Sequence, residues 1–112
     1  MSKLETLVGK LISKAFPSYR VKTQHYVVYQ NTRLLFDYLI PELKIALEVQ
    51  GEQHFSFTSF YHDTEEDFKN QKFRDKLKTQ WADENGYVLI AIDDIALKMK
   101  TAEFKKFILE RL

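Results

Sequence analysis

The stretch LLFDYLIPELKIALEVQ, residues 34–50, decides the fold of this chain. Apolar side chains alternate on both sides of Pro41, which predicts two strands, because proline cannot continue a central strand. A connection this short makes the two strands an antiparallel pair. A four-residue connection would place Asp37 directly opposite Glu48, and a two-residue connection would place Glu48 on the diagonal. In either register Asp37, Glu48 and Gln50 lie on one face of the sheet.

Elsewhere the spacing of apolar residues predicts helices and further strands. Apolar residues three and four apart indicate helices, whereas β-branched and aromatic runs indicate strands. The expected elements are a helix over 4–15, strands over 20–30, 34–40, 45–50 and 87–92, a long charged helix over 65–85, and a final helical segment that Asp94 or Thr101 could cap. Strict alternation would place residues 34, 36, 38 and 40 on one face of their strand. The order α-β-β-β-α-β-α describes an α/β (α+β) fold, a mixed central sheet flanked by helices, in a single domain over residues 1–112.

Composition narrows the class of protein. A length of 112 residues suits one domain, and 45% hydrophobic with 29% charged residues is typical of a globular chain. A formal charge of +1 argues against a protein that coats nucleic acid electrostatically. The chain has no cysteine, which excludes disulfides, thiolate zinc sites and a cysteine nucleophile. No apolar run approaches the roughly 18 residues of a membrane span, so we expect no membrane partner and a cytoplasmic location.

The paired carboxylates point to metal chemistry. Asp37 and Glu48 are flanked by apolar residues, and ionised groups away from water need a partner charge or a metal ion. Mg²⁺ prefers hard oxygen ligands, so two acids and the backbone carbonyl of Val49 would suit it, with Mn²⁺ able to replace it. Such a site indicates phosphodiester hydrolysis. The alternative is structural, with the two acids forming buried ion pairs with Lys22, Lys44 or a lysine of the long helix.

Longer segments of the chain resemble a known family of enzymes. They are FDYLIP at residues 36–41, LEVQGEQH at 47–54, KFRD at 72–75 and GYVLI at 86–90. Together they are similar to PD-(D/E)XK nucleases, and most similar to the branch that contains the very short patch repair endonucleases and related phage and intron homing endonucleases. The resemblance covers most of the chain and implies a restriction-endonuclease-like fold.

The resemblance also implies roles for single residues. Gln50 occupies the superfamily's lysine position, where glutamine is a known variant. Because an amide does not titrate near neutral pH, the role of general base would fall to His54. Gln53 would orient water or phosphate, and two helical acids would orient His54 or hold a second cation. The catalytic set of that branch, a helical Glu, a strand Asp, a His after the third strand and a helical Asp, would fall on Glu5, Asp37, His54 and Asp75.

The expected function is that of a Mg²⁺-dependent DNA endonuclease. Lys72, Arg74 and Lys76 of the long helix would contact the DNA backbone, which positions an enzyme without reading sequence. Because 112 residues leave no room for a targeting domain, specificity would come from a separate DNA-targeting partner or from the chain's own loops. The oligomeric state is open, and a homodimer would supply the two active sites that two coordinated cuts usually need. Very short patch repair endonucleases carry a cysteine-containing zinc site, so mismatch repair is not expected of this chain. The alternatives are an inactive module that binds nucleic acid or protein, and a structure-selective resolvase or RNA nuclease.

Overall fold

A computed structural model describes residues 3–50, 64–93 and 98–112. The described residues form three helices around one four-stranded sheet, in the predicted order. The elements are α1 (Lys3–Ala15), β1 (Lys22–Tyr29), β2 (Thr32–Ile40), β3 (Ile45–Val49), α2 (Glu65–Asn85), β4 (Val88–Ile92) and α4 (Thr101–Leu109). The predicted mixed α+β architecture is therefore confirmed.

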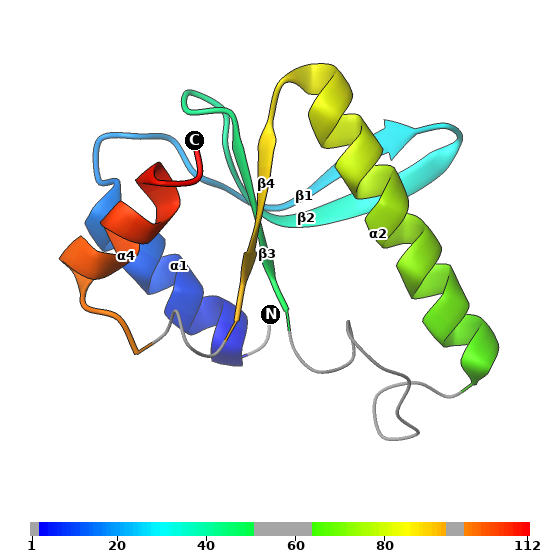
Figure 1. Ribbon diagram of the computed structural model, residues 1–112, viewed down its shortest axis with the longest axis horizontal. Coiled ribbons are helices and arrows are strands. Elements are labelled where there is room, and N and C mark those ends of the chain that lie inside the picture. Colours follow the sequence, from blue (N-terminus) through cyan, green and yellow to red (C-terminus); the bar gives the residue numbers. More distant parts are fainter. Residues whose placement is uncertain (1–2, 51–63, 94–97) are drawn as a thin grey trace.

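The strands lie in the order β1-β2-β3-β4 across the sheet. The pairs β1–β2 and β2–β3 are antiparallel, whereas β3 and β4 are parallel and are joined through α2. Figure 1 shows α1 and α4 on one side of the sheet and α2 on the other. A parallel pair needs such a crossover, because its second strand must start at the same end as the first.

The ends of α2 follow ordinary capping chemistry. Thr64 is the N-cap, and its hydroxyl accepts a hydrogen bond of 3.1 Å from the backbone N–H of Asp67. Gly86 ends the helix with φ of 72°, a left-handed conformation that glycine adopts without steric cost. The predicted stop at Asn85 and Gly86 is thus confirmed, and it directs the chain straight into β4.

Two apolar clusters hold the layers together. The α1/α4 core joins α1 and α4 to one face of the sheet, and the α2 core joins α2 to the other. In the α2 core the ring centroid of Trp81 lies 4.9 Å from those of both Phe36 and Tyr87. Along β3, Ile45, Leu47 and Val49 belong to the α1/α4 core and Ala46 to the α2 core, so the predicted alternation of this strand is confirmed.

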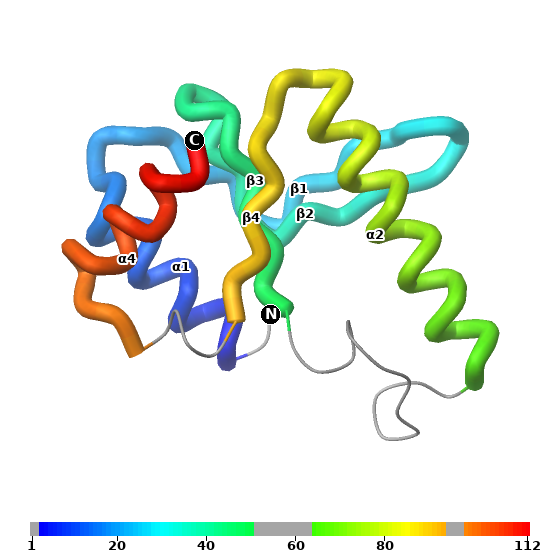
Figure 2. Tube along the Cα trace, viewed as in Figure 1, coloured from blue at the N-terminus to red at the C-terminus, as the bar shows by residue number. Residues whose placement is uncertain are grey.

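The predicted alternation of β2 is wrong at one point. Phe36 packs in the α2 core, whereas Tyr38, two residues later, packs in the α1/α4 core. The pairing with β1 is regular on both sides of Asp37 and its opposite residue Gln24, but Gln24 has φ of 51°. A left-handed residue in one strand bends and twists the pair, so the side chains beyond it exchange faces. Figure 2 shows the hairpin of β1 and β2 turning away from β3 and running behind α2.

Candidate active site

Asp37 and Glu48 lie opposite each other on neighbouring strands. The connection from Ile40 to Ile45 spans four residues, and the pairing that starts there continues to Tyr38 and Leu47. The next pair in this register is Asp37 and Glu48. The first of the two registers considered from the sequence is therefore the one observed.

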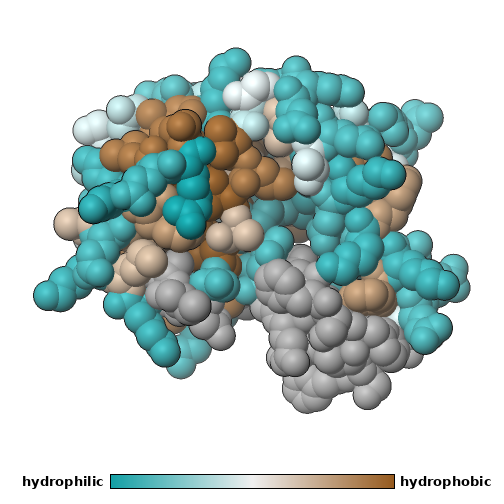
Figure 3. Space-filling view, in the orientation of Figure 1, coloured by the Kyte–Doolittle hydropathy of each residue, from teal (hydrophilic) through white to brown (hydrophobic). Residues whose placement is uncertain are grey.

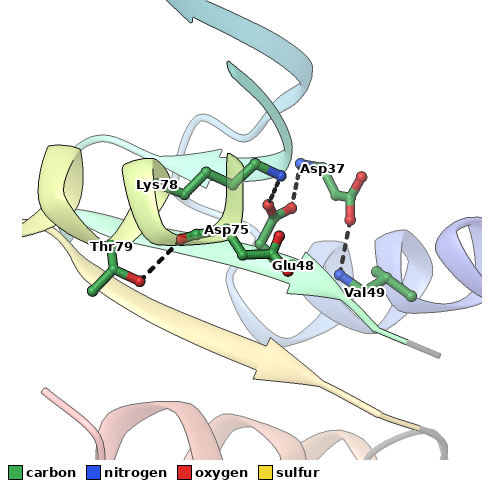
Figure 4. A network of polar contacts seen from close by, with 6 residues as sticks. All are labelled: Asp37, Glu48, Val49, Asp75, Lys78 and Thr79. Atoms are coloured by element: carbon green, nitrogen blue, oxygen red, sulfur yellow. Dashed lines mark hydrogen bonds and ion pairs between the residues drawn. The ribbon is translucent and has the colours of Figure 1, made fainter. Parts of the chain in front are cut away.

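Hydrogen bonds cross between the two strands at this pair (Figure 4). The backbone N–H of Asp37 donates to Oε2 of Glu48 over 3.1 Å. The backbone N–H of Val49 donates to Oδ2 of Asp37 over 2.8 Å. Each carboxylate is thus held by the main chain of the opposite strand, which fixes both side chains without using up all of their oxygens.

Glu48 is a buried acid with a lysine beside it. Only 6% of the residue is exposed, and its Oε1 accepts a hydrogen bond and ion pair from Nζ of Lys78 on α2. Burial raises the pKa of Glu48, the Lys78 ammonium lowers it and the negative charge of Asp37 raises it, and the net result of these effects is a pKa of about 7. At neutral pH this carboxyl therefore lies close to the midpoint of its titration.

Lys78 was not among the predicted site residues, although a lysine of the long helix was considered as a structural partner. It lies between Leu77 and Trp81, both of which pack in the α2 core, so helical periodicity turns it toward the sheet. Its Nζ also lies 5.5 Å from the ring centroid of Phe36. The position of this lysine beside two apolar residues of the helix was the feature of the sequence that could have indicated its contact with Glu48.

Glu5 of α1 approaches the same end of the sheet through two polar contacts. Its Oε2 accepts a hydrogen bond of 2.7 Å from the amide of Gln24, the residue opposite Asp37. Its backbone carbonyl accepts one of 2.5 Å from the hydroxyl of Tyr38. Burial raises the pKa of Tyr38, and the charges of Glu5 and Asp37 raise it further, so both acids act on this phenol. The hydroxyl stays protonated and remains a donor.

Asp75 of α2 lies one helical turn before Lys78. Figure 4 shows its side chain extending from the helix toward the end of β3 that carries Glu48. Its backbone carbonyl accepts a hydrogen bond of 3.2 Å from the hydroxyl of Thr79. The structure thus brings the predicted helical acids Glu5 and Asp75 toward the Asp37 and Glu48 pair from opposite faces of the sheet.

The other predicted site residues fall into two groups. Gln50 is half-buried directly after β3, and its backbone N–H donates to the carbonyl of Ile92 over 2.8 Å. Gln53 and His54 lie outside the described residues. The three basic residues of α2 that were predicted to contact DNA are exposed, and Figure 3 shows a hydrophilic surface over this helix. They are Lys72, Arg74 and Lys76.

The oxygen donors at the Asp37 and Glu48 pair fit a hard divalent cation. No three acidic or histidine side chains form a metal-binding group within the part of the chain that the structure describes. A main-chain carbonyl oxygen could serve as a third metal ligand. The N–H and C=O of one strand residue face the same neighbouring strand. Since the N–H of Val49 faces Asp37, its carbonyl faces the same side. Two carboxylates and one carbonyl are the ligand types that Mg²⁺ takes from proteins.

None of the described helices is both long enough and apolar enough to cross a membrane.

Two viral proteins are similar to part of this chain. Uncharacterized protein 033L of Invertebrate iridescent virus 3 is 34% identical over 82 residues, which are 73% of this chain and 41% of that protein. Uncharacterized protein 307L of Invertebrate iridescent virus 6 is 37% identical over 62 residues, which are 55% of this chain and 32% of that protein. The chain thus spans less than half the length of these curated relatives. No family model matches it and no solved structure matches it, so the restriction-endonuclease-like fold stays a prediction.

Proposed function

We propose that this protein is a metal-dependent endonuclease that hydrolyses phosphodiester bonds in DNA. The observation that carries the proposal is the placement of Asp37 directly across from Glu48, with the main chain of Val49 beside both. A buried acid whose pKa lies near 7 adds support, because perturbed pKa values cluster at functional sites. The sequence resemblance to homing and repair endonucleases points to the same chemistry.

In this proposal Asp37, Glu48 and the carbonyl of Val49 hold a Mg²⁺ ion, or Mn²⁺ in its place. When bound, such an ion supplies Lewis-acid chemistry and lowers the pKa of water. Glu48 must lose its proton to act as a ligand, and the neighbouring ammonium of Lys78 favours that loss. Lys78 is therefore a positioning residue that lowers the pKa of Glu48 and so increases the ionised fraction of this carboxyl.

The general base remains the part of the proposal that rests on resemblance alone. Gln50 follows Glu48 on β3, but its amide does not titrate, so it can only donate or accept hydrogen bonds. His54 has the right chemistry, since a neutral imidazole accepts a proton near pH 7. Glu5 and Asp75 would orient that imidazole from the two helices that approach the site.

One observation favours a second function. The ion pair between Lys78 and Glu48 already supplies the buried carboxylate with a cation, as a structural ion pair would. A catalytically inactive module that binds nucleic acid or protein would need no metal at this position. The two functions differ in whether a divalent ion takes over from Lys78 as the partner of Glu48.

Nicking of supercoiled plasmid tests the proposal. The wild type is incubated with Mg²⁺, with Mn²⁺ and with a chelator, and parallel reactions contain RNA or a four-way DNA junction. We expect metal-dependent nicking of the plasmid that Asp37→Asn and Glu48→Gln reduce to background. Asp83→Asn is the matched control, because Asp83 is an exposed acid on α2, and it should retain full activity.

Circular dichroism and thermal melting verify that each variant is folded. Wild-type protein that leaves every substrate intact with both metals would overturn the nuclease proposal and favour the binding module. Cleavage of only the RNA or only the junction would support the proposed roles of Asp37 and Glu48, but it would show that plasmid DNA is not the substrate.

A further inference from the structure

A groove with both polar and apolar lining runs along the side of α1 that faces β1. Its volume is about 470 Å³. Lysine and hydroxyl side chains contribute to its lining, as do Gly9, Val21 and the phenol of a buried tyrosine. The residues that supply the polar part of the lining are Thr6, Lys10, Ser13, Lys14, Thr23 and Tyr38.

The wall of the groove depends on a glycine. A Cβ atom at Gly9 would lie 2.5 Å from Oη of Tyr38, so only glycine lets this hydroxyl approach α1 so closely. The same hydroxyl donates to the backbone carbonyl of Glu5. The side chain of Glu5 in turn contacts Gln24, the residue opposite Asp37, so the groove begins near the Asp37 side of the proposed active site and leads away from it along α1.

The chemistry of the lining suits an anionic ligand. None of the described residues that line the groove is acidic, and both lysines are exposed. Lys10 and Lys14 are one helical turn apart, about 6 Å along the axis at 1.5 Å per residue. The lining from Thr6 to Lys14 extends about 12 Å along α1.

We propose that this groove binds the sugar–phosphate backbone of a DNA strand that leads into the active site. The inference rests on the proposed function, because it assigns the groove to the same substrate. Lys10 and Lys14 would each neutralise one phosphate, and the hydroxyls of Thr6, Ser13 and Thr23 would donate to phosphate oxygens. Backbone contacts of this kind fix the register of a duplex and are independent of its sequence.

Salt dependence of DNA binding tests the groove directly. Affinity for a DNA duplex is measured in Ca²⁺ at several salt concentrations for the wild type, Lys10→Ala, Lys14→Ala and the double variant. The slope of log affinity against log salt is negative, and each lost phosphate contact should make it less negative by about 0.9, so the double variant should have a slope less negative by about 1.8. Lys105→Ala is the matched control, since Lys105 is an exposed lysine on α4, and it should keep the wild-type slope.

A second measurement locates the DNA. The chain has no cysteine, so Ser13→Cys introduces a single thiol that can carry an iron chelate. Radicals from this chelate should cut the bound DNA well above background. The same chelate on Lys105→Cys should cut at background level.

The outcomes separate this inference from the proposed function. A double variant that keeps the wild-type salt slope, in a protein that nicks plasmid, would overturn the groove and leave the nuclease standing. A less negative slope with directed cutting from position 13, in a protein that nicks nothing, would support the groove and overturn the nuclease. Equal cutting from positions 13 and 105 would also overturn the groove.

Discussion

Replacing Glu48 by glutamine should remove a pH dependence from the stability of the protein. The folded state raises the pKa of this carboxyl from its ordinary value of 4.5 to about 7, chiefly through burial. The folded protein thus holds this proton more tightly than the unfolded chain does. The stabilisation by the protonated form is fully present below about pH 4.5 and is lost as the pH rises through about 7.

The size of the effect follows from the two pKa values. At about 1.36 kcal/mol for each pH unit, the rise from 4.5 to about 7 corresponds to about 3 kcal/mol, most of which falls between pH 5 and pH 8. Glutamine has the shape of the protonated acid and does not titrate. The Glu48→Gln variant should therefore match the wild type closely at pH 5 and exceed its stability by about 2 to 3 kcal/mol at pH 8.

Urea unfolding at pH 5 and pH 8 measures this difference, and the carboxyl carbon signal of Glu48 gives the pKa directly. Glu66→Gln is the matched control, because Glu66 is an exposed acid on α2, and its effect should be equal at both pH values. A Glu48→Gln variant whose stability relative to wild type is the same at pH 5 and pH 8 would refute the reasoning. So would a measured pKa of Glu48 near 4.5.

Two further variants test the ion pair of Glu48 and the close approach of Tyr38 to Gly9. Lys78→Met removes the ammonium that lowers the pKa of Glu48, so the carboxyl carbon of Glu48 should titrate clearly above pH 7. The control Lys76→Met changes an exposed lysine and should leave the pKa of Glu48 near 7. The same pKa of Glu48 in both variants would contradict the ion pair. Gly9→Ala brings a Cβ to 2.5 Å from the buried hydroxyl of Tyr38 and should cost about 1 to 3 kcal/mol in urea unfolding. Adding Tyr38→Phe should recover most of that loss, and a double variant as unstable as Gly9→Ala would show that the clash is not the cause.

Much of the fold could be predicted because its signals are local. The alternation along β3 and the stop at Gly86 each depend on a few neighbouring residues. The pairing of Asp37 with Glu48 needed only one more quantity, the length of the connection after Pro41. The sequence left that length open between two values, and the structure has the longer one.

The rest could not be predicted, because it depends on contacts between distant residues. Strict alternation assumes an evenly twisted strand, and the left-handed conformation of Gln24 breaks that assumption at Asp37. The sequence around Gln24 does not predict a positive φ, because the position is occupied by neither glycine nor asparagine. Lys78 was visible as a lysine on the core side of a helix, but its contact with Glu48 joins residues 30 positions apart.

The cost of burying Glu48 is itself an argument about function. A glutamine at this position would keep the hydrogen bond from the backbone of Asp37 and avoid about 3 kcal/mol of penalty above neutral pH. If Lys78 served stability alone, two well-packed apolar side chains would often do as well or better than this buried pair. An ionisable oxygen ligand is what a divalent cation needs and what an amide cannot replace. Under the proposed function, the cost of this buried acid would be offset by its role as a metal ligand, which an amide could not take.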